Sequence, residues 1–172
     1  MKAVVVPEAG RLEVIDVTLW EPEAGEVRVR LDAAAMCITD TLSVGGDGLT
    51  PFPLIPGHSA TGTVVAVGPD TTRVAAGDRV IVVGSAQCTH CYYCEHDAPG
   101  ACEQIFDGMS RVIGTDSDGR AVHADGGVAT MAEEMIYRES NVVVVSSAAD
   151  PKHLAMLGCG IVSGLGAVFD VA

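Results

Sequence analysis

Residues 88–102 read Cys88-Thr-His-Cys91-Tyr-Tyr-Cys94-Glu-His-Asp-Ala-Pro-Gly-Ala-Cys102, and the rest of the chain is organised around them. Four of the six cysteines lie in this stretch, with the spacing C-x2-C-x2-C-x7-C. Four thiolates so close in sequence, with Pro99-Gly100 to turn the chain back, suit a tetrahedral metal site without an open position. Such a closed zinc site is structural, because it holds a loop together and carries out no chemistry.

Two other kinds of site could use the cysteines of this lobe (about residues 85–105), an iron–sulfur cluster or a pair of disulfides. An iron–sulfur cluster would fit the C-x2-C-x2-C start, but the bacterial ferredoxin run closes after three residues and a proline, whereas this one closes after seven and is followed by Glu103. Disulfides are disfavoured because the apolar run after Met1 is short and stops at Pro7, which is not a signal peptide and favours a cytoplasmic, reducing compartment. His90 and His96 lie inside the lobe, and we expect them to be solvated rather than ligands.

Length and composition restrict the remaining classes. The chain has 172 residues, enough for one domain, with 48% hydrophobic and only 4% aromatic residues, which favours sheet-rich packing of small aliphatic side chains. A formal charge of −13 argues against nucleic acid and anionic membrane surfaces as partners. The apolar run 154–169 is interrupted by glycines and shorter than a spanning helix needs, so we expect a packed helix there.

Short strands separated by turn signals make up most of the predicted elements. We expect a mainly β domain with a few helices, barrel-like or a distorted sandwich, and no parallel βαβ alternation. Residues 103–120 are predicted to be a surface excursion, 122–132 a strand, and Asp150-Pro151 the start of a helix over about 150–172. The other predicted strands are 2–6, 11–17, 26–31, 61–67, 80–83 and 141–145, and 45–56 is predicted to be loop.

Two cysteines remain outside the lobe. Cys37 and Cys159, together with His58, would make an open zinc site with three protein ligands and a fourth position for water or substrate. Each residue alone is weak evidence, because a buried cysteine is usually a small hydrophobe and a histidine after glycine is usually a turn residue.

The order of motifs resembles that of the zinc-dependent medium-chain alcohol dehydrogenases, over residues 25–166. Besides the cysteine lobe, the matching pieces are Cys37-Ile38-Thr39-Asp40, Gly57-His58, Val74-x-x-Gly77-Asp78-Arg79-Val80, Asp107-Gly108-Met109-Ser110-Arg111 and Gly158-Cys159-Gly160. The piece 107–111 leans toward the branch with the formaldehyde-handling, thiol-adduct enzymes. The resemblance implies the GroES-like barrel of the catalytic domain over residues 1–172.

The resemblance also implies the roles of individual residues. Cys37, His58 and Cys159 would bind a catalytic Zn(2+), Thr39 would hydrogen-bond the substrate hydroxyl, and Asp40 would orient His58. A structural Zn(2+) would be held by Cys88, Cys91, Cys94 and Cys102. The implied reaction is oxidation of an alcohol to an aldehyde or ketone by hydride transfer to NAD or NADP.

Two residues depart from the family pattern. The position after the ligating histidine usually holds glutamate and here holds Ser59, and the position three residues after Thr39, a histidine relay in some members, is Leu42. The loss of the glutamate puts normal turnover in question but not zinc binding, and with Leu42 in the other position a proton relay from Thr39 must run another way, by cofactor ribose and water.

The nucleotide-binding half of such an enzyme is not found in this sequence. No Gly-x-Gly-x-x-Gly follows a strand, since Gly164-Leu165-Gly166 lacks the third glycine. We expect part of a longer enzyme that neither binds NAD nor turns over by itself, acts on a small-molecule alcohol or aldehyde, and forms a homo-oligomer at full length. The alternative is a non-catalytic zinc-binding scaffold.

Overall fold

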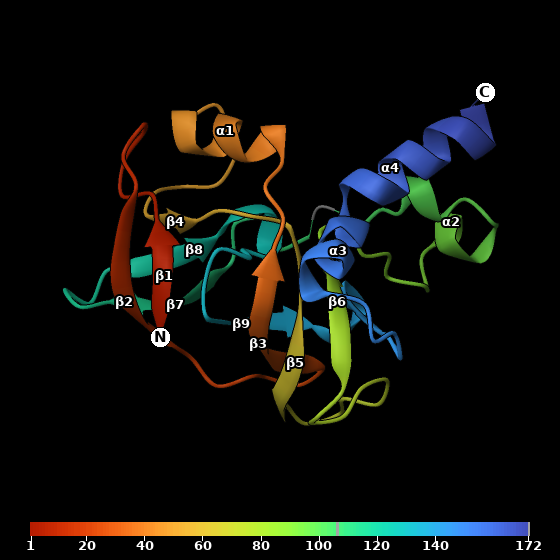
Figure 1. The fold of residues 1–172 in the computed structure, drawn as a ribbon, viewed down its shortest axis with the longest axis horizontal. Helices are drawn as coiled ribbons and strands as arrows, with labels where there is room; N and C mark the ends of the chain where they lie inside the picture. Colours follow the sequence, from red (N-terminus) through yellow and green to blue (C-terminus); the bar gives the residue numbers. More distant parts are fainter. Residues whose placement is uncertain (106, 172) are drawn as a thin grey trace.

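Strands dominate the computed structural model, which describes residues 1–105 and 107–171 (Figure 1). The strands are β1 (Lys2–Val5), β2 (Glu13–Leu19), β3 (Glu26–Ala34), β4 (Leu54–Ile55), β5 (Ser59–Val67), β6 (Arg79–Val83), β7 (Val112–Asp116), β8 (Ala121–Ala124), β9 (Glu134–Arg138) and β10 (Val142–Val144). The helices and helical turns are α1 (Ile38–Gly45), α2 (Tyr92–Glu95), η1 (Pro99–Ala101), η2 (Asp125–Gly127), η3 (Glu139–Asn141), α3 (Pro151–Ala155), η4 (Met156–Gly158), α4 (Gly160–Gly166) and η5 (Ala167–Val171). The expected mainly β fold is confirmed.

Two five-stranded sheets form the body of the molecule. Their orders are β1-β2-β7-β8-β4 and β10-β6-β5-β3-β9. Val6 and Leu54 exchange backbone hydrogen bonds of 2.8 and 3.1 Å, so β4 returns to the end of β1 and the first sheet nearly closes on itself. A bridge between Ala3 and Ala132 joins this sheet to the segment before β9. The result is the barrel-like body that the short strands predicted.

The core consists mainly of valine, alanine and isoleucine from both sheets. Val5, Val29, Val82 and Ile113 are almost completely buried. Side chains branched at Cβ pack well on pleated strands, which is how so few aromatic residues suffice. Tyr137 is the exception, and its hydroxyl reaches the carbonyl of Ala129 at 3.2 Å.

β3 and β5 are paired through two irregularities in register. Val27 and Val29 are buried in the core, whereas Leu31, two residues further along the same strand, is only half-buried. The register shifts between Arg28 and Val29 and again beyond Leu31. Gly62 lies at this place, and a Cβ there would come within 2.2 Å of the carbonyl oxygen of Arg30. The close approach of the two strands therefore requires glycine.

Several predicted elements need correction. The prediction of a surface excursion at 103–120 is wrong for the second half of that range, because β7 pairs with β2 and β8 and buries Ile113. The strand predicted at 122–132 ends at Ala124, where the chain turns into η2. Helix α1, the two-residue strand β4 inside the predicted loop, and β9 were not predicted. Polar, glycine-rich composition hid β7, which is half-buried and pairs through its backbone.

The predicted helix start at Asp150 is confirmed, and its continuation is broken. Asp150 Oδ1 accepts the N–H of Lys152 at 2.9 Å, and Pro151 occupies the first helical position. The helix breaks at Cys159, whose φ and ψ of −146° and −79° are not helical. Figure 1 shows α4 leading away from the strands toward the C-terminus.

In the described ranges, no single helix has the length and apolarity to cross a membrane. The bent pair Pro151–Gly158 and Gly160–Phe169, with 55° between its halves, meets that test by length and composition only.

Candidate active site

Three separate parts of the chain bring Cys37, His58 and Cys159 together. Cys37 precedes α1, His58 precedes β5, and Cys159 lies at the break between η4 and α4. Their ligand atoms all lie within 4.8 Å of one another. His58 Nε2 is 3.3 Å from Cys159 Sγ, which is 4.0 Å from Cys37 Sγ. Ligands of one tetrahedral zinc lie roughly 3.3–3.8 Å apart, so the three donors fit a single ion.

Asp40 lies behind this cluster and is 2% exposed. Its Oδ2 accepts the N–H of Cys37 at 2.7 Å, and its Oδ1 lies 2.9 Å from His58 Nδ1. When Nδ1 donates its proton to this carboxylate, Nε2 is left with a lone pair that faces the two sulfurs. One carboxylate therefore contacts both the start of α1 and the ring of His58.

Hydrogen bonds change the proton affinity of two of the three donors in opposite directions. Hydrogen bonds from the side chain and backbone of Thr39 lower the pKa of Cys37 to about 7. The hydrogen bond to Asp40 raises the pKa of His58 to about 9. Burial, with the nearby charge of Cys37, raises the pKa of Cys159. Thiolate character is thus concentrated at Cys37, next to a histidine that a metal ion would have to deprotonate.

Cys159 is held in place by tight packing beneath it. The buried hydroxyl of Ser59 donates to the carbonyl of Ala155 at the end of α3. A Cβ on Gly158 would lie 2.2 Å from the carbonyl oxygen of Val82 and 2.5 Å from Ser59 Oγ. Ser59 therefore faces the turn that carries Cys159, a role that the sequence did not predict.

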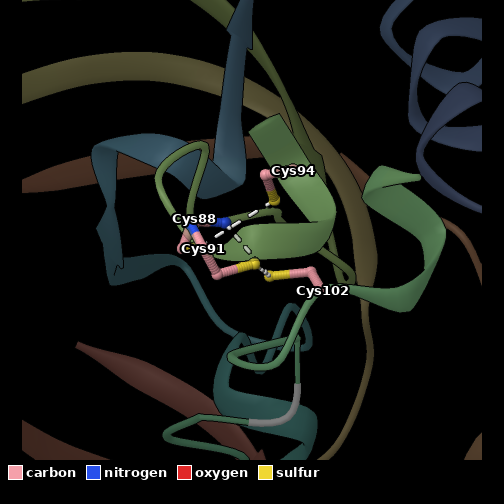
Figure 2. Close-up of side chains that lie close together, drawn as sticks. All are labelled: Cys88, Cys91, Cys94 and Cys102. Atoms are coloured by element: carbon pink, nitrogen blue, oxygen red, sulfur yellow. Dashed lines mark hydrogen bonds between the residues drawn. The ribbon is translucent and has the colours of Figure 1, made fainter. Parts of the chain in front are cut away.

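The four remaining cysteines gather in one lobe, which Figure 2 shows. Cys88 Sγ lies 3.9 Å from Cys94 Sγ, and Cys91 Sγ lies 4.0 Å from Cys102 Sγ. All four sulfurs lie within 4.8 Å of one another, and all six cysteines of the chain are free. A multi-iron cluster would place the thiolates on different irons and spread them more widely, whereas this arrangement has room for one ion.

Backbone N–H groups point at the sulfurs of this lobe. Cys91 N–H donates to Cys88 Sγ at 3.3 Å, and the N–H groups of Cys88 and Gln104 both point at Cys102 Sγ at 3.4 Å. The N–H groups of Cys94 and Glu103 lower the pKa of Cys91, while burial and the neighbouring Cys91 raise that of Cys94. Such donors stabilise thiolates, which is what a metal ion requires of them.

Neither histidine of the lobe belongs to the four-sulfur group. His90 is exposed, with Nδ1 2.6 Å from the carbonyl oxygen of Cys88. His96, also exposed, stacks on Tyr92 with ring centroids 4.2 Å apart.

A pocket of about 580 Å³ opens beside the three-residue cluster and is lined by His58, Cys159 and Thr39. Thr39 Oγ1 lies 3.5 Å from His58 Nε2. The pocket wall also contains Leu42 and Met109, together with residues that the sequence did not single out: Leu49, Thr50, Ile105, Asp125 and Val162. They come from α1, the loop before β4, the segment before β7, η2 and α4, and no regular spacing in the sequence connects them.

Comparison with known proteins agrees with this geometry. Residues 23–147 match the family model for the alcohol dehydrogenase GroES-like domain. The chain belongs to this family. The match covers β3 through β10 and includes Cys37, His58 and the four-cysteine lobe, and Cys159 lies beyond it.

Relatives of known name are dehydrogenases of the same family. S-(hydroxymethyl)glutathione dehydrogenase of Synechocystis sp. is 30% identical over 181 residues, which cover 99% of this chain and 48% of the relative. The enzyme of that name from Escherichia coli O1:K1 is 29% identical over 94% of this chain and 46% of its own. The chain thus spans about half the length of the relatives that it matches.

Solved structures of the family superpose closely. An alcohol dehydrogenase zinc-binding domain protein from Burkholderia ambifaria gives a TM-score of 0.90 at 31% identity, over 98% of this chain and 48% of that one. Benzyl alcohol dehydrogenase from Acinetobacter calcoaceticus gives a TM-score of 0.85 at 30% identity, over 98% of this chain and 47% of that one. A cobalt- and zinc-bound alcohol dehydrogenase from Pyrobaculum aerophilum gives 0.80 at 27% identity, over 100% and 49%. The GroES-like fold of the catalytic domain is therefore established.

Proposed function

We propose that this chain supplies the catalytic domain of a zinc-dependent dehydrogenase that oxidises an alcohol to an aldehyde or ketone, with NAD or NADP as hydride acceptor. The observation that carries the proposal is the convergence of Cys37, His58 and Cys159 at the end of a pocket, with Asp40 behind the histidine. Membership of the alcohol dehydrogenase GroES-like family supports the reaction class.

Two zinc ions are proposed, with different tasks. The three-residue group leaves a fourth tetrahedral position open toward the pocket, and a zinc ion there would polarise the substrate oxygen and lower the pKa of its hydroxyl. The group formed by Cys88, Cys91, Cys94 and Cys102 has no such opening, and its ion would cross-link the lobe.

The residues around the open group prepare the substrate hydroxyl for reaction. Thr39 lines the pocket next to His58 Nε2 and is placed to accept the hydroxyl proton at Oγ1. Asp40 holds the Nδ1 proton of His58 and so keeps the ring turned toward the metal position. Leu42 lines the same pocket, so a proton leaving Thr39 passes through water or the cofactor rather than through a side chain at that position.

Ser59 in place of the usual glutamate leaves the proposed reaction possible. Its hydroxyl binds the carbonyl of Ala155 and stabilises the turn before Cys159. No ligand or proton-transfer role is assigned to it.

The proposed substrate is a small alcohol or aldehyde. The full-length enzyme is proposed to be cytoplasmic and to form a homo-oligomer. The names of two similar proteins suggest the first substrates to test, S-(hydroxymethyl)glutathione and benzyl alcohol. The strongly acidic composition supports neither nucleic acid nor an anionic membrane as a partner.

The test is oxidation of alcohols by the zinc-loaded protein at its natural length, followed through reduction of NAD or NADP. Thr39→Val should lower kcat at least about a hundredfold, because the proton acceptor is lost. Thr41→Val is the matched control, since Thr41 is exposed on the same helix and its hydroxyl binds only the carbonyl of Ile38. No oxidation of any alcohol by the metal-loaded protein would favour the zinc-binding scaffold instead.

A further inference from the structure

The pocket beside Cys37, His58 and Cys159 is apolar over most of its wall. Its apolar side chains are those of Leu42 on α1, Val162 on α4, and Leu49, Ile105 and Met109. An occupant whose reactive end meets the metal position therefore has its body against aliphatic side chains. With a volume of about 580 Å³, the pocket accepts a molecule the size of a substituted benzyl alcohol.

Outside the metal-ligating group, which includes His58, the charged side chains of this wall are all carboxylates. Asp47 and Asp125 line the pocket, and within residues 1–105 and 107–171 no lysine or arginine does. Asp125 is half-buried, and none of the ion pairs in the described part of the chain involves it. Its carboxylate therefore lines the pocket with no lysine or arginine of the described residues beside it to offset the charge.

Asp125 is also fixed in position. The hydroxyl of Thr50, which is 6% exposed, lies 2.9 Å from Asp125 Oδ1 and 3.1 Å from the carbonyl oxygen of Met109. This contact ties η2 to the loop before β4. A carboxylate held by a buried partner cannot swing away from an anionic ligand at low cost.

We propose that Asp125, assisted by Asp47, makes this pocket select uncharged or cationic alcohols and reject anionic ones. The inference rests on the proposed function, because it assigns the substrate class of the same site. An anionic group within about 6 Å of a fixed, partly buried carboxylate meets repulsion worth about a tenfold loss of binding. A glutathione adduct carries two carboxylates and one ammonium, so it is expected to be a poor substrate despite the names of the relatives.

Three para-substituted benzyl alcohols test this: 4-methyl, 4-carboxy and 4-(aminomethyl). They share a ring and a hydroxyl and differ in charge. With the zinc-loaded protein at its natural length, we expect kcat/KM for the carboxylate to be at least about tenfold below that for the methyl compound, and the ammonium compound to match or exceed the methyl compound. Calorimetric binding without nicotinamide cofactor should give the same order.

Substitution assigns the effect to the proposed residues. Asp125→Asn keeps an acceptor for Thr50 and should raise the carboxylate-to-methyl ratio of kcat/KM several-fold, and Asp47→Asn, at an exposed position, should raise it less. Asp118→Asn removes the same charge from the exposed turn between β7 and β8 and should leave the ratio unchanged. The proposal is overturned if the carboxylate binds as well as the methyl compound, or if neither Asp125→Asn nor Asp47→Asn changes the ratio.

The two proposals fail in different ways. Binding in the expected order without oxidation of any alcohol would contradict the proposed dehydrogenase function but support the selection of ligands by charge. Oxidation of all three alcohols with equal kcat/KM would remove the charge selection and leave the dehydrogenase function. Absence of binding by every member of the series would overturn both.

Discussion

Asp40 is the single side chain on which the geometry of the three-residue metal group depends most. Its two oxygens accept from the backbone of Cys37 and from the ring of His58, so two of the three ligands are positioned by one buried carboxylate. The resemblance of the Cys-x-Thr-Asp motif to the family pattern implied that Asp40 orients His58. The structure adds the contact to Cys37, which closes the first turn of α1.

Asp40→Asn should therefore lower zinc affinity at this group by about ten- to a hundredfold, the usual effect of removing a partner of a ligating histidine. Competition with a chromogenic chelator measures it, and the four-cysteine group should keep its ion. Asp32→Asn, exposed at the end of β3, is the control. Equal zinc affinity in Asp40→Asn and the wild type would show that the carboxylate does not orient the ligands.

Ser59 is the second residue whose role became clear only in three dimensions. Ser59→Ala should lower the free energy of unfolding by about 1 kcal/mol, because a buried hydroxyl–carbonyl bond is lost. Urea denaturation measures this, with Ser146→Ala, at an exposed position, as control. An unchanged free energy of unfolding in Ser59→Ala would mean that the turn before Cys159 does not depend on this bond.

Among the elements, the β7–β8 hairpin shows how the sequence can mislead. Its glycines and aspartates predicted a surface excursion, yet Asp116 is buried, and its carboxylate organises the turn. Asp116 Oδ1 accepts from the N–H groups of Asp118 and Arg120 at 2.9 Å, and Oδ2 accepts from Arg120 Nε at 2.8 Å. Burial opposes ionisation, but these hydrogen bonds outweigh it and lower the pKa of Asp116 below its ordinary 3.8.

The hairpin should therefore be sensitive to acid. Because the folded pKa is lowered, the ionised carboxylate stabilises the fold above its ordinary pKa, and this contribution is lost as pH falls through the folded value. Asp116→Asn should be less stable than the wild type at neutral pH, with the difference shrinking below about pH 4. Urea denaturation across this range measures it, and an unchanging difference would contradict the assignment.

Elements whose signals lie in neighbouring residues were predicted, and elements that depend on pairing with distant parts of the chain were not. The alternation at 26–31 and the Asp150-Pro151 helix start depend on neighbouring residues, so they could be read from the sequence. β4 has only two residues and exists because Leu54 pairs with Val6 and His123. α1 was missed because its N-cap is Cys37, which is not among the side chains that usually begin a helix, and the acid that closes its first turn is Asp40.

The same division holds for the site. The residue types and their order predicted two groups of metal-ligating side chains, and the structure brings the members of each group together. The pocket wall could not be predicted, because Thr50 and Asp125 are 75 residues apart and meet only through the fold.

At the scale of the whole molecule, the two metal groups differ in what they hold together. The four-cysteine group closes a lobe that has little regular structure besides α2 and η1. Cys88→Ser should therefore lower the thermal midpoint sharply, since binding of a structural zinc is coupled to folding. Calorimetry with and without added zinc measures this. An unchanged midpoint would mean that the lobe is stable without its ion.

The three-residue group, in contrast, is assembled on strands and helices that the core already stabilises. The most direct test of the account is the zinc content, per chain, of the wild type and of His58→Ala, with the fold followed by circular dichroism. The account predicts two zinc ions in the wild type and one in a folded His58→Ala. One zinc ion in both proteins, or a His58→Ala variant that unfolds as Cys88→Ser does, would contradict it.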